Sequence, residues 1–237
     1  MHLAIVRAFA ETASFRLPEA HTFHKTLPLP PQTTLIGILG AALGFTAEGA
    51  HQWVEEHHVR MGVAGRHRGQ MKDLWKYRKI KTAEVISDVL LREHLIDLTM
   101  TLVYAVEDES VAMRIVGGFQ NPVYALTAGP SDSLLKVREA LLIENAAMTP
   151  TTIFQFCVIP GDITGAGCYR PDPAVLRGPI IESVRAPWVA HLPVRFSYEG
   201  GRREVGARGP FSFIGNRIHL ADPVDAYHVG EEAIAVS

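Results

Sequence analysis

The chain has 237 residues, of which 47% are hydrophobic and 20% charged, and its formal net charge is −2 at pH 7. These values are typical of a folded globular protein with a buried core. A nearly neutral chain excludes uniform electrostatic binding of nucleic acid but leaves room for a local basic patch. No basic leader precedes an apolar block at the N-terminus, so we expect a cytoplasmic protein with no membrane partner.

The N-terminal elements are predicted to be a strand, a proline-rich loop and a helix. Residues 2–9 are rich in β-forming side chains and favour a strand. Residues 14–31 contain four prolines, which favours an irregular loop. Thr33 and Thr34 follow a double proline, where their hydroxyls can accept N–H groups at the start of a helix. The helix is predicted to reach residue 45 and to continue to Trp53.

Three glycines interrupt this helix, although each costs about 0.5–1 kcal/mol relative to alanine. Gly37, Gly40 and Gly44 are spaced three and four residues apart, which places them on one helix face. We interpret them as structural residues that let the helix lie close to a sheet or to a neighbouring loop.

The next elements predict a ferredoxin-like fold of the α+β class. Residues 58–64 and 98–106 favour strands, and a helix capped by Asp108 or Ser110 should end at Gly117 and Gly118. A further strand is predicted at 122–127. The order strand, helix, strand, strand, helix, strand is the split βαβ arrangement, in which both helices cover one face of an antiparallel sheet. RNA-recognition domains share this architecture, which is an analogy only because their aromatic-rich signature is absent.

Residues 148–237 are predicted to form a mostly β region, after an N-terminal domain at 1–147 with a hairpin at about 64–97. Short β-like runs occur at 152–159, 188–198 and 211–220. The glycine-rich stretches at 160–167 and 199–209 lack the strand-to-helix context of a nucleotide-binding loop, so we interpret them as turns between strands.

The segment from residue 64 to 81 concentrates positive charge beside aromatic rings. It holds seven cations and the single acid Asp73, and Trp75 and Tyr77 lie among the cations. Lysine and arginine contact phosphates, and aromatic faces stack on unpaired bases with about 1–3 kcal/mol per base. The pattern predicts a single-stranded RNA binder. The alternative is a solvated basic hairpin whose Trp75 packs on the body of the protein.

The start of the first helix is a second candidate site. Backbone N–H groups at residues 33–35 and the positive end of the helix dipole favour an anion such as a phosphate. His24 and Lys25 lie just upstream and could flank it. Simple capping of the helix is the alternative.

No metal site or cofactor is predicted. Neither the pair His21 and His24 nor the neighbours His57 and His58 have acidic or cysteine partners at metal-site spacing. The two cysteines, at 157 and 168, are expected to be free thiols.

Metal-free RNA cleavage needs a base for the 2′-hydroxyl, a cation for the developing charge and an acid for the leaving oxygen. His67, Lys76, Tyr77 and Lys79 are chemically suitable, but a plain RNA-binding surface contains the same residue types. A small-ligand enzyme with its anion site at the first helix is a further alternative.

The stretch ASFRLPEAHTFHKTLPLPPQTTLIGILGAALGF resembles the Cas-five family of CRISPR-associated proteins, with a Phe-Arg-x-Pro loop before a proline-rich segment and a glycine-containing helix. The resemblance is specific over residues 14–45. The basic hairpin and NPVYALTAGPSDSL support it more loosely, and it fades after about residue 140. It implies a ferredoxin-fold member of the RAMP superfamily that sits at the foot of a type I Cascade effector and holds the 5′ repeat-derived handle of the crRNA.

The resemblance also implies the partners of the protein. The basic hairpin would be a thumb that lies against the guide and the adjacent backbone subunit. The partners expected are crRNA, a backbone subunit of the Cas-seven family, a large subunit of the Cas-eight family and, indirectly, target DNA.

One branch of the family, in subtype I-C, is an endoribonuclease with a Tyr, Lys and His set that cannot be placed on this sequence residue by residue. The sequence of the first helix is closer to that of the non-catalytic subunits, as in type I-B. We therefore expect an RNA-binding subunit that is not an enzyme, with an endoribonuclease as the alternative. The predicted RNA-binding residues are Arg16, His24, Lys25, Thr33, Thr34, Arg66, Arg68, Lys72, Trp75, Lys76, Tyr77, Arg78, Lys79 and Lys81.

Overall fold

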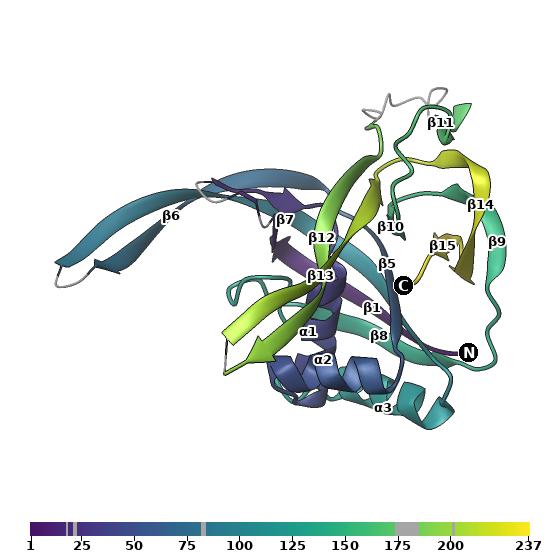
Figure 1. Cartoon of the computed structure of the whole chain (residues 1–237), viewed down its shortest axis with the longest axis horizontal. Helices are drawn as coiled ribbons and strands as arrows, with labels where there is room; N and C mark the ends of the chain where they lie inside the picture. The colour runs from purple at the N-terminus through teal and green to yellow at the C-terminus, as the bar shows by residue number, and fades with distance from the viewer. Residues whose placement is uncertain (18, 21–22, 82–83, 174–184, 201) are drawn as a thin grey trace.

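The computed structural model describes residues 1–17, 19–20, 23–81, 84–173, 185–200 and 202–237. It is a mixed α+β structure made mostly of strands (Figure 1). The helices are α1 (Gln32–Leu43), α2 (Ala47–Glu56) and α3 (Glu109–Gln120). The strands are β1 (His2–Ala13), β2 (Phe15–Arg16), β3 (Phe23–His24), β4 (Thr26–Leu27), β5 (Arg60–Arg66), β6 (Gly69–Lys81), β7 (Glu84–Val106), β8 (Lys136–Ile143), β9 (Thr149–Phe154), β10 (Cys157–Pro160), β11 (Tyr169–Pro171), β12 (Trp188–Glu199), β13 (Arg202–Ile214), β14 (Ile218–Val229) and β15 (Glu232–Ile234).

The main sheet has the strand order β12-β13-β10-β5-β7-β1-β8, and β3 and β6 pair with β7 beside this path. Its central strands β5, β7, β1 and β8 are antiparallel to their neighbours. Both α1 and α3 pack on one face of these strands. The hydroxyl of Tyr104 on β7 donates to the carbonyl of Leu35 in α1 at 3.1 Å, and its ring stacks on Phe119 of α3.

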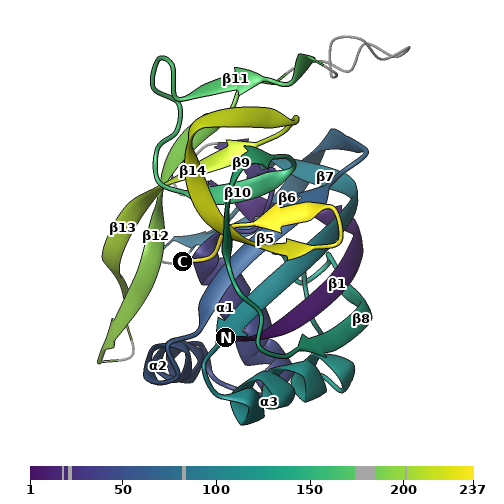
Figure 2. The same ribbon diagram turned by 90° about the vertical axis from the view of Figure 1, so that its right-hand side faces the viewer.

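The alternation of side chains along β1 separates two hydrophobic cores. Ala4 and Val6 belong to the core under the helices, whereas Leu3 and Ile5 point into a second core with residues of β9, β14 and β15. Figure 2 shows β14 across the upper part of the molecule and α2 and α3 at its base. The sheet face opposite the helices is therefore covered by C-terminal strands.

The projecting hairpin is formed by β6 and the first half of β7 (Figure 1). The two strands pair without interruption from Gly69 opposite Ile96 to Lys81 opposite Glu84. The same strand β7 then enters the body, where residues 100–106 are all buried. The predicted hairpin at 64–97 is thus the exposed extension of the central strand.

The first helix differs from its prediction at both ends. Its N-cap is Pro31, which makes no side-chain cap bond, so Thr33 and Thr34 do not cap the helix as expected. Gly44 ends α1 in the left-handed conformation, with φ 79°. The predicted continuation to Trp53 is a separate helix, α2, which meets α1 at 101°. Among the described residues, no single helix is long and apolar enough to cross a membrane, and α1 and α2 reach that composition only as this bent pair.

The predicted strand at 122–127 is wrong, and the fourth strand of the central sheet is β8 instead. The N–H groups of Val123 and Tyr124 donate to the carbonyls of Ala42 and Ala41 at the end of α1, so this segment cannot join the sheet. The helix before it, α3, also continues through the two glycines at which it was expected to end. Its predicted cap is confirmed at Asp108, whose carboxylate accepts the N–H of Ser110 at 2.7 Å.

The helix glycines do not form the close contact with the sheet that one interpretation expected. A Cβ at Gly40 would lie 2.5 Å from the Cβ of Ala50, so the close neighbour is α2. Gly44 is needed for its positive φ, and a Cβ there would meet Val123 of the neighbouring loop. Gly37 is exposed, and a Cβ there would meet nothing within 4 Å, which contradicts a packing role for this residue.

C-terminal strands extend the N-terminal sheet. β10 joins β5 through Cys157 opposite Ala64, and β13 and β12 follow outward. Leu192 and Phe213 from these strands lie in the core under the helices. The two regions share one sheet, and the division at residues 147 and 148 stays a prediction.

We predict that substitutions at two glycines of α1 change stability in opposite directions. Gly40→Val should lower the free energy of unfolding by about 1–3 kcal/mol, because the added side chain overfills the contact with Ala50. Gly37→Ala should raise it by about 0.5–1 kcal/mol, because alanine favours the helix and meets no neighbour. Urea denaturation measures both, and equal effects at the two positions would contradict this account.

Candidate nucleic-acid interface

The two faces of the hairpin carry different chemistry. Side chains alternate along β6, so Lys72, Lys76 and Arg78 share one face while Trp75 and Tyr77 share the other. Trp75 and Tyr77 are therefore separated in space from Lys72, Lys76 and Arg78, the three cations of β6 whose side chains the structure describes. Lys79 and Lys81 occupy strand positions in β6, but their side chains lie outside the described residues.

The aromatic face presents a stacked pair of rings. Trp75 and Tyr77 have centroids 5.4 Å apart, and the His24 ring lies 6.2 Å from Trp75. Trp75 is 41% exposed, so part of its ring is accessible for stacking on a base. The Tyr77 hydroxyl donates to Asp88 at 3.0 Å, and this hydrogen bond raises the pKa of the tyrosine.

Arg92 fixes the inner end of this face. Its guanidinium lies 5.5 Å from the Trp75 ring and pairs with Asp73 at 3.2 Å and Asp132 at 3.1 Å. The Arg92 side chain is only 12% exposed. Two acids already neutralise this cation, so it stabilises the hairpin instead of offering a charge to a phosphate.

The cationic face is free to bind an anion. Lys72, Lys76 and Arg78 are exposed, and none of them has an ion-pair partner among the described residues. Leu74 and Val89 on the same face are 70% and 55% exposed. This face therefore combines unpaired positive charge with accessible apolar area.

A cavity of about 460 Å³, which we call the root pocket, lies where the hairpin joins the body. It contains the predicted residues Arg66 and Arg68. The Arg66 guanidinium lies 3.9 Å from the centre of the Phe156 ring. Arg68 pairs with Asp97 at 3.5 Å but is 82% exposed, so this ion pair is weak. The lining consists of Pro28, Leu29, Gly65, Arg66, His67, Arg68, Gly69, Phe156, Cys157, Arg185, Ala186, Trp188, Phe213, Ile214, Gly215 and Asn216.

His67 enters the root pocket as a neutral imidazole. Its Nδ1 lies 3.1 Å from the carbonyl of Gly69, which can only accept, so Nδ1 carries the proton and Nε2 is the acceptor. Burial lowers the pKa of His67 from its ordinary value, and the charge of Arg185 acts in the same direction, against the Gly69 hydrogen bond.

A second cavity of about 420 Å³, the helix-start pocket, brings three predicted residues together. Arg16, Thr33 and Thr34 line it at the N-terminus of α1. Its opposite wall is the β12–β13 hairpin, with Leu192, Pro193, Phe196, Arg203, Val205 and Arg208. Lys25 is exposed near the root of the basic hairpin and lines neither pocket.

The arginines of the helix-start pocket are held in place by neighbours. The guanidinium of Arg203 lies 4.6 Å from the centre of the Phe196 ring. Arg208 donates to Glu19 at 3.0 Å and to the carbonyl of His191 at 3.2 Å. A further cation, Arg16 of β2, completes a positive lining beside the start of the helix, which favours an anion there.

The C-terminal residues of both pockets were not predicted from the sequence. Arg203 and Arg208 lie in the stretch 199–209, which was predicted to be a turn, whereas residues 202–209 belong to strand β13 and pair with β12. The arginines in that stretch were the available signal. Arg185 and Trp188 gave none, because nothing local relates them to the hairpin more than a hundred residues earlier.

The fold and the site define an α+β protein, mostly of strands, with a basic and aromatic hairpin above two cationic pockets. The family model described as "CRISPR-associated protein (Cas_Cas5)" matches residues 5–140, more than half of the chain. The chain therefore belongs to the Cas-five family of CRISPR-associated proteins, which confirms the family indicated by residues 14–45. No curated protein matches the sequence.

Solved structures share the fold over nearly the whole chain. A CRISPR protein from Archaeoglobus fulgidus has a TM-score of 0.55 at 11% identity and covers 100% of this chain and 99% of its own. A chain of a CRISPR RNA-guided surveillance complex has a TM-score of 0.53 at 14% identity, with coverages of 96% and 94%. A chain of the Type III-B Cmr-beta complex bound to cognate target RNA and AMPPnP has a TM-score of 0.53 at 11% identity, with coverages of 92% and 86%.

We predict that His67 titrates below pH 6.5 in the folded protein. Because its folded pKa is lower than its unfolded pKa, the unfolded state binds more protons between the two values. The contribution of His67 to stability is therefore complete above pH 6.5 and is lost as pH falls toward the folded pKa. NMR titration of the imidazole in folded and in urea-unfolded protein measures both values. A folded midpoint at or above the unfolded one would contradict the buried, neutral assignment.

Proposed function

We propose that the protein is a non-enzymatic RNA-binding subunit of a type I CRISPR Cascade effector. It binds the 5′ repeat-derived handle of crRNA and caps the complex, which acts in antiviral defence. The observation that carries this proposal is the gathering of exposed cations beside accessible aromatic rings, on the hairpin face and in the root pocket. Phosphates and unpaired bases are the ligands that such a surface recognises.

The fold and the family support the proposal. The antiparallel order β5-β7-β1-β8, with α1 and α3 on one face, supports a ferredoxin-like N-terminal domain. Membership of the Cas-five family supports a role in a CRISPR effector. The similar chains come from an RNA-guided surveillance complex and from a complex bound to target RNA, which supports an RNA partner within an assembly.

The hairpin offers surface for protein neighbours as well as for RNA. Leu74 and Ile80 on its cationic face are 70% and 81% exposed, and a stable monomer gains nothing from such exposure on a projecting arm. We assign this apolar area to the backbone subunit of the Cas-seven family. A large subunit of the Cas-eight family would then contact the body, and target DNA would be reached through the guide.

Charge reversal of the cationic face tests the proposal. Lys72→Glu, Lys76→Glu and Arg78→Glu together should weaken crRNA binding at least about tenfold, because each lost phosphate contact also removes counterion release. A matched control with the same change of charge reverses Lys136, Arg138 and Arg170, which are exposed on β8 and β11, outside the hairpin. Mobility-shift titration and co-purification with effector subunits measure the effect. Equal losses in the two triple variants would sink the proposal.

A metal-independent endoribonuclease is the second candidate, and one observation favours it. Neutral His67, with Nε2 as acceptor, could take a proton from a 2′-hydroxyl beside the guanidinium groups of Arg66 and Arg185. The described lining of the root pocket nevertheless offers no second group suited to protonate the leaving oxygen. Arginine does not deprotonate, and burial raises the pKa of Cys157.

The other residues considered for cleavage do not join His67. Tyr77 and Lys76 lie on opposite faces of the hairpin, and neither lines the root pocket. The root pocket offers a base and cations for cleavage, but its described lining offers no general acid. Binding is therefore the better supported function.

We predict that purified protein in EDTA does not cut repeat RNA at any pH from acid to mildly alkaline. Denaturing gel electrophoresis of end-labelled repeat RNA measures this. Cleavage at a single position that disappears in His67→Gln would establish the endoribonuclease instead. Cleavage that survives this substitution would indicate a contaminating nuclease.

A further inference from the structure

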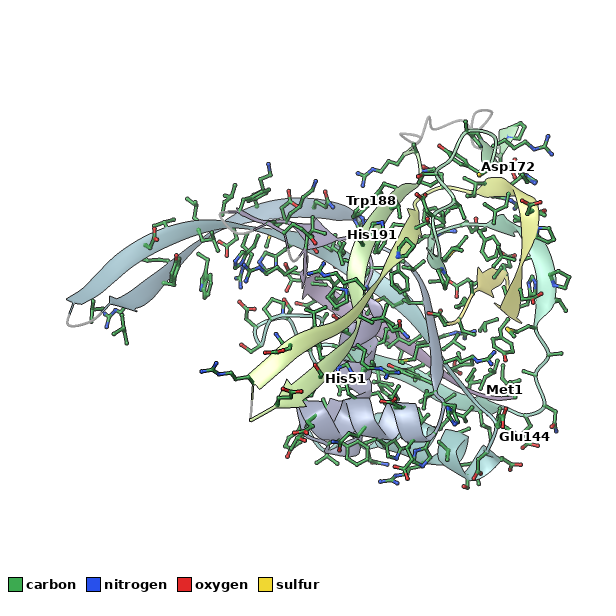
Figure 3. The ribbon with its side chains drawn as sticks, in the orientation of Figure 1. Met1, His51, Glu144, Asp172, Trp188 and His191 are labelled. Atoms are coloured by element: carbon green, nitrogen blue, oxygen red, sulfur yellow. The ribbon has the colours of Figure 1, made fainter. Side chains whose placement is uncertain are left out.

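The root pocket exposes an aromatic ring that the core already holds in position. Trp188 begins β12 directly opposite Phe213 on β13, and the two rings stack with centroids 4.8 Å apart and planes 17° apart. Phe213 covers one face of the indole, and the side chain is still 38% exposed. The other face and the edge of the ring therefore border the cavity, beside the base of the hairpin (Figure 3).

Three arginines from separate parts of the chain surround this ring. Arg66 and Arg68 come from the end of β5 and the turn after it, and Arg185 precedes β12. None of the described residues that line the cavity is acidic. An anionic ligand is the one that this lining stabilises.

The walls of the pocket are fixed before any ligand arrives. The Arg66 guanidinium is held on the ring of Phe156, which adopts a left-handed backbone with φ 48°. The backbone N–H of Gly65 in β5 donates to the carbonyl of Phe156 at 2.7 Å. Asn216 is 7% exposed, and its Oδ1 accepts the N–H of Arg185 at 2.8 Å. A preformed site loses less conformational entropy when it binds.

The size and shape of the cavity limit the ligand. A volume of about 460 Å³ is at the lower end of the range for small-molecule sites, which suits one nucleotide. Paired bases in a duplex cannot reach a recessed ring, whereas an unpaired base of single-stranded RNA can be turned out and stacked on it.

We infer that the root pocket binds one unpaired nucleotide of RNA, with its base stacked on Trp188 and its phosphate held by Arg66, Arg68 and Arg185. This assignment rests on the proposed function and deepens it. The hairpin supplies contacts along the RNA strand. The pocket holds one nucleotide and thereby sets the register of the bound RNA on the protein.

The test uses the full chain and the RNA that co-purifies with it, resynthesised with a fluorescent label. Trp188→Ala should weaken binding about tenfold, within the 1–3 kcal/mol of one base stack, and Trp188→Phe should lose less. The dependence of affinity on salt should not change with Trp188→Ala, because stacking releases no counterion. Arg68→Ala should lower the slope of log affinity against log salt by about 0.7.

Abasic substitution of the RNA locates the nucleotide. Copies of the probe that lack one base at successive positions are bound to wild-type protein and to Trp188→Ala. At one position, removal of the base should lower the affinity for wild-type protein about tenfold. The same removal should not lower the affinity for Trp188→Ala any further. Trp75→Ala, on the hairpin, is the matched control: it leaves the pocket intact, so its affinity should fall about tenfold at that position, as it does for wild-type protein.

The outcomes separate this inference from the proposed function. If no RNA co-purifies, the proposed function fails and the pocket assignment fails with it. If RNA binds but Trp188→Ala and Arg68→Ala bind like wild type, the pocket assignment alone is wrong. A loss in Trp188→Ala that is the same for every abasic probe would indicate a structural effect and would also overturn it. Arg68 is 82% exposed, so its variant reports on binding without affecting the fold.

Discussion

Every functional feature of this protein depends on how one long strand satisfies its backbone hydrogen bonds. β7 runs for 23 residues and needs partners on both edges wherever it is buried. On one edge β5 and β6 follow each other in the same register, with Arg66 opposite Thr99 and Gly69 opposite Ile96. On the other edge β1 pairs with the inner half, and the short strand β3 continues beyond it. The hairpin therefore extends the core sheet and does not depend on a flexible loop for its position.

The break between β5 and β6 explains why the root pocket lies where it does. The two strands leave only residues 67 and 68 between them, and the N–H of Arg68 still donates to Ile96 of β7. His67 and Arg68 are thus presented at a point where the backbone is held on one side and where β10 approaches from the other. The proline-rich loop lies between this pocket and the helix-start pocket, since Pro28 lines the first and Pro31 the second. Proline fixes φ, which limits the conformations open to the loop at these two positions.

The sequence predicted the features that depend on local pattern. The strand at the N-terminus, the helix after the double proline and the basic hairpin follow from β-propensity, proline chemistry and the run of cations, and residues 14–45 identified the family. Features that depend on contacts between distant residues could not be predicted from the sequence. Residues 122–127 look like a strand but are bound by the carbonyls at the end of α1, and Gly37 looks like its neighbour Gly40 but faces no helix.

The candidate site shows the same division. Arg16, Thr33 and Arg66 were predicted from the residues around them, whereas Arg203 and Trp188 reach the pockets only because β13 and β12 join the sheet through β10. Predicting a strand from the sequence does not predict which strand it pairs with. The second wall of each pocket could therefore be identified only from the tertiary structure. The separation of the aromatic and cationic faces could have been read from the alternation of β6, once its strand character was accepted.

The two chemically different faces of the hairpin also restrict how its length can vary among relatives. Inserting one residue into β6 would turn every outer side chain to the opposite face and exchange the aromatic and cationic surfaces beyond that point. Two-residue changes, matched in β6 and β7, would lengthen or shorten the arm and preserve both faces. Natural length variation in this arm is therefore expected in even steps on each strand, with odd steps confined to its tip or accompanied by a β-bulge.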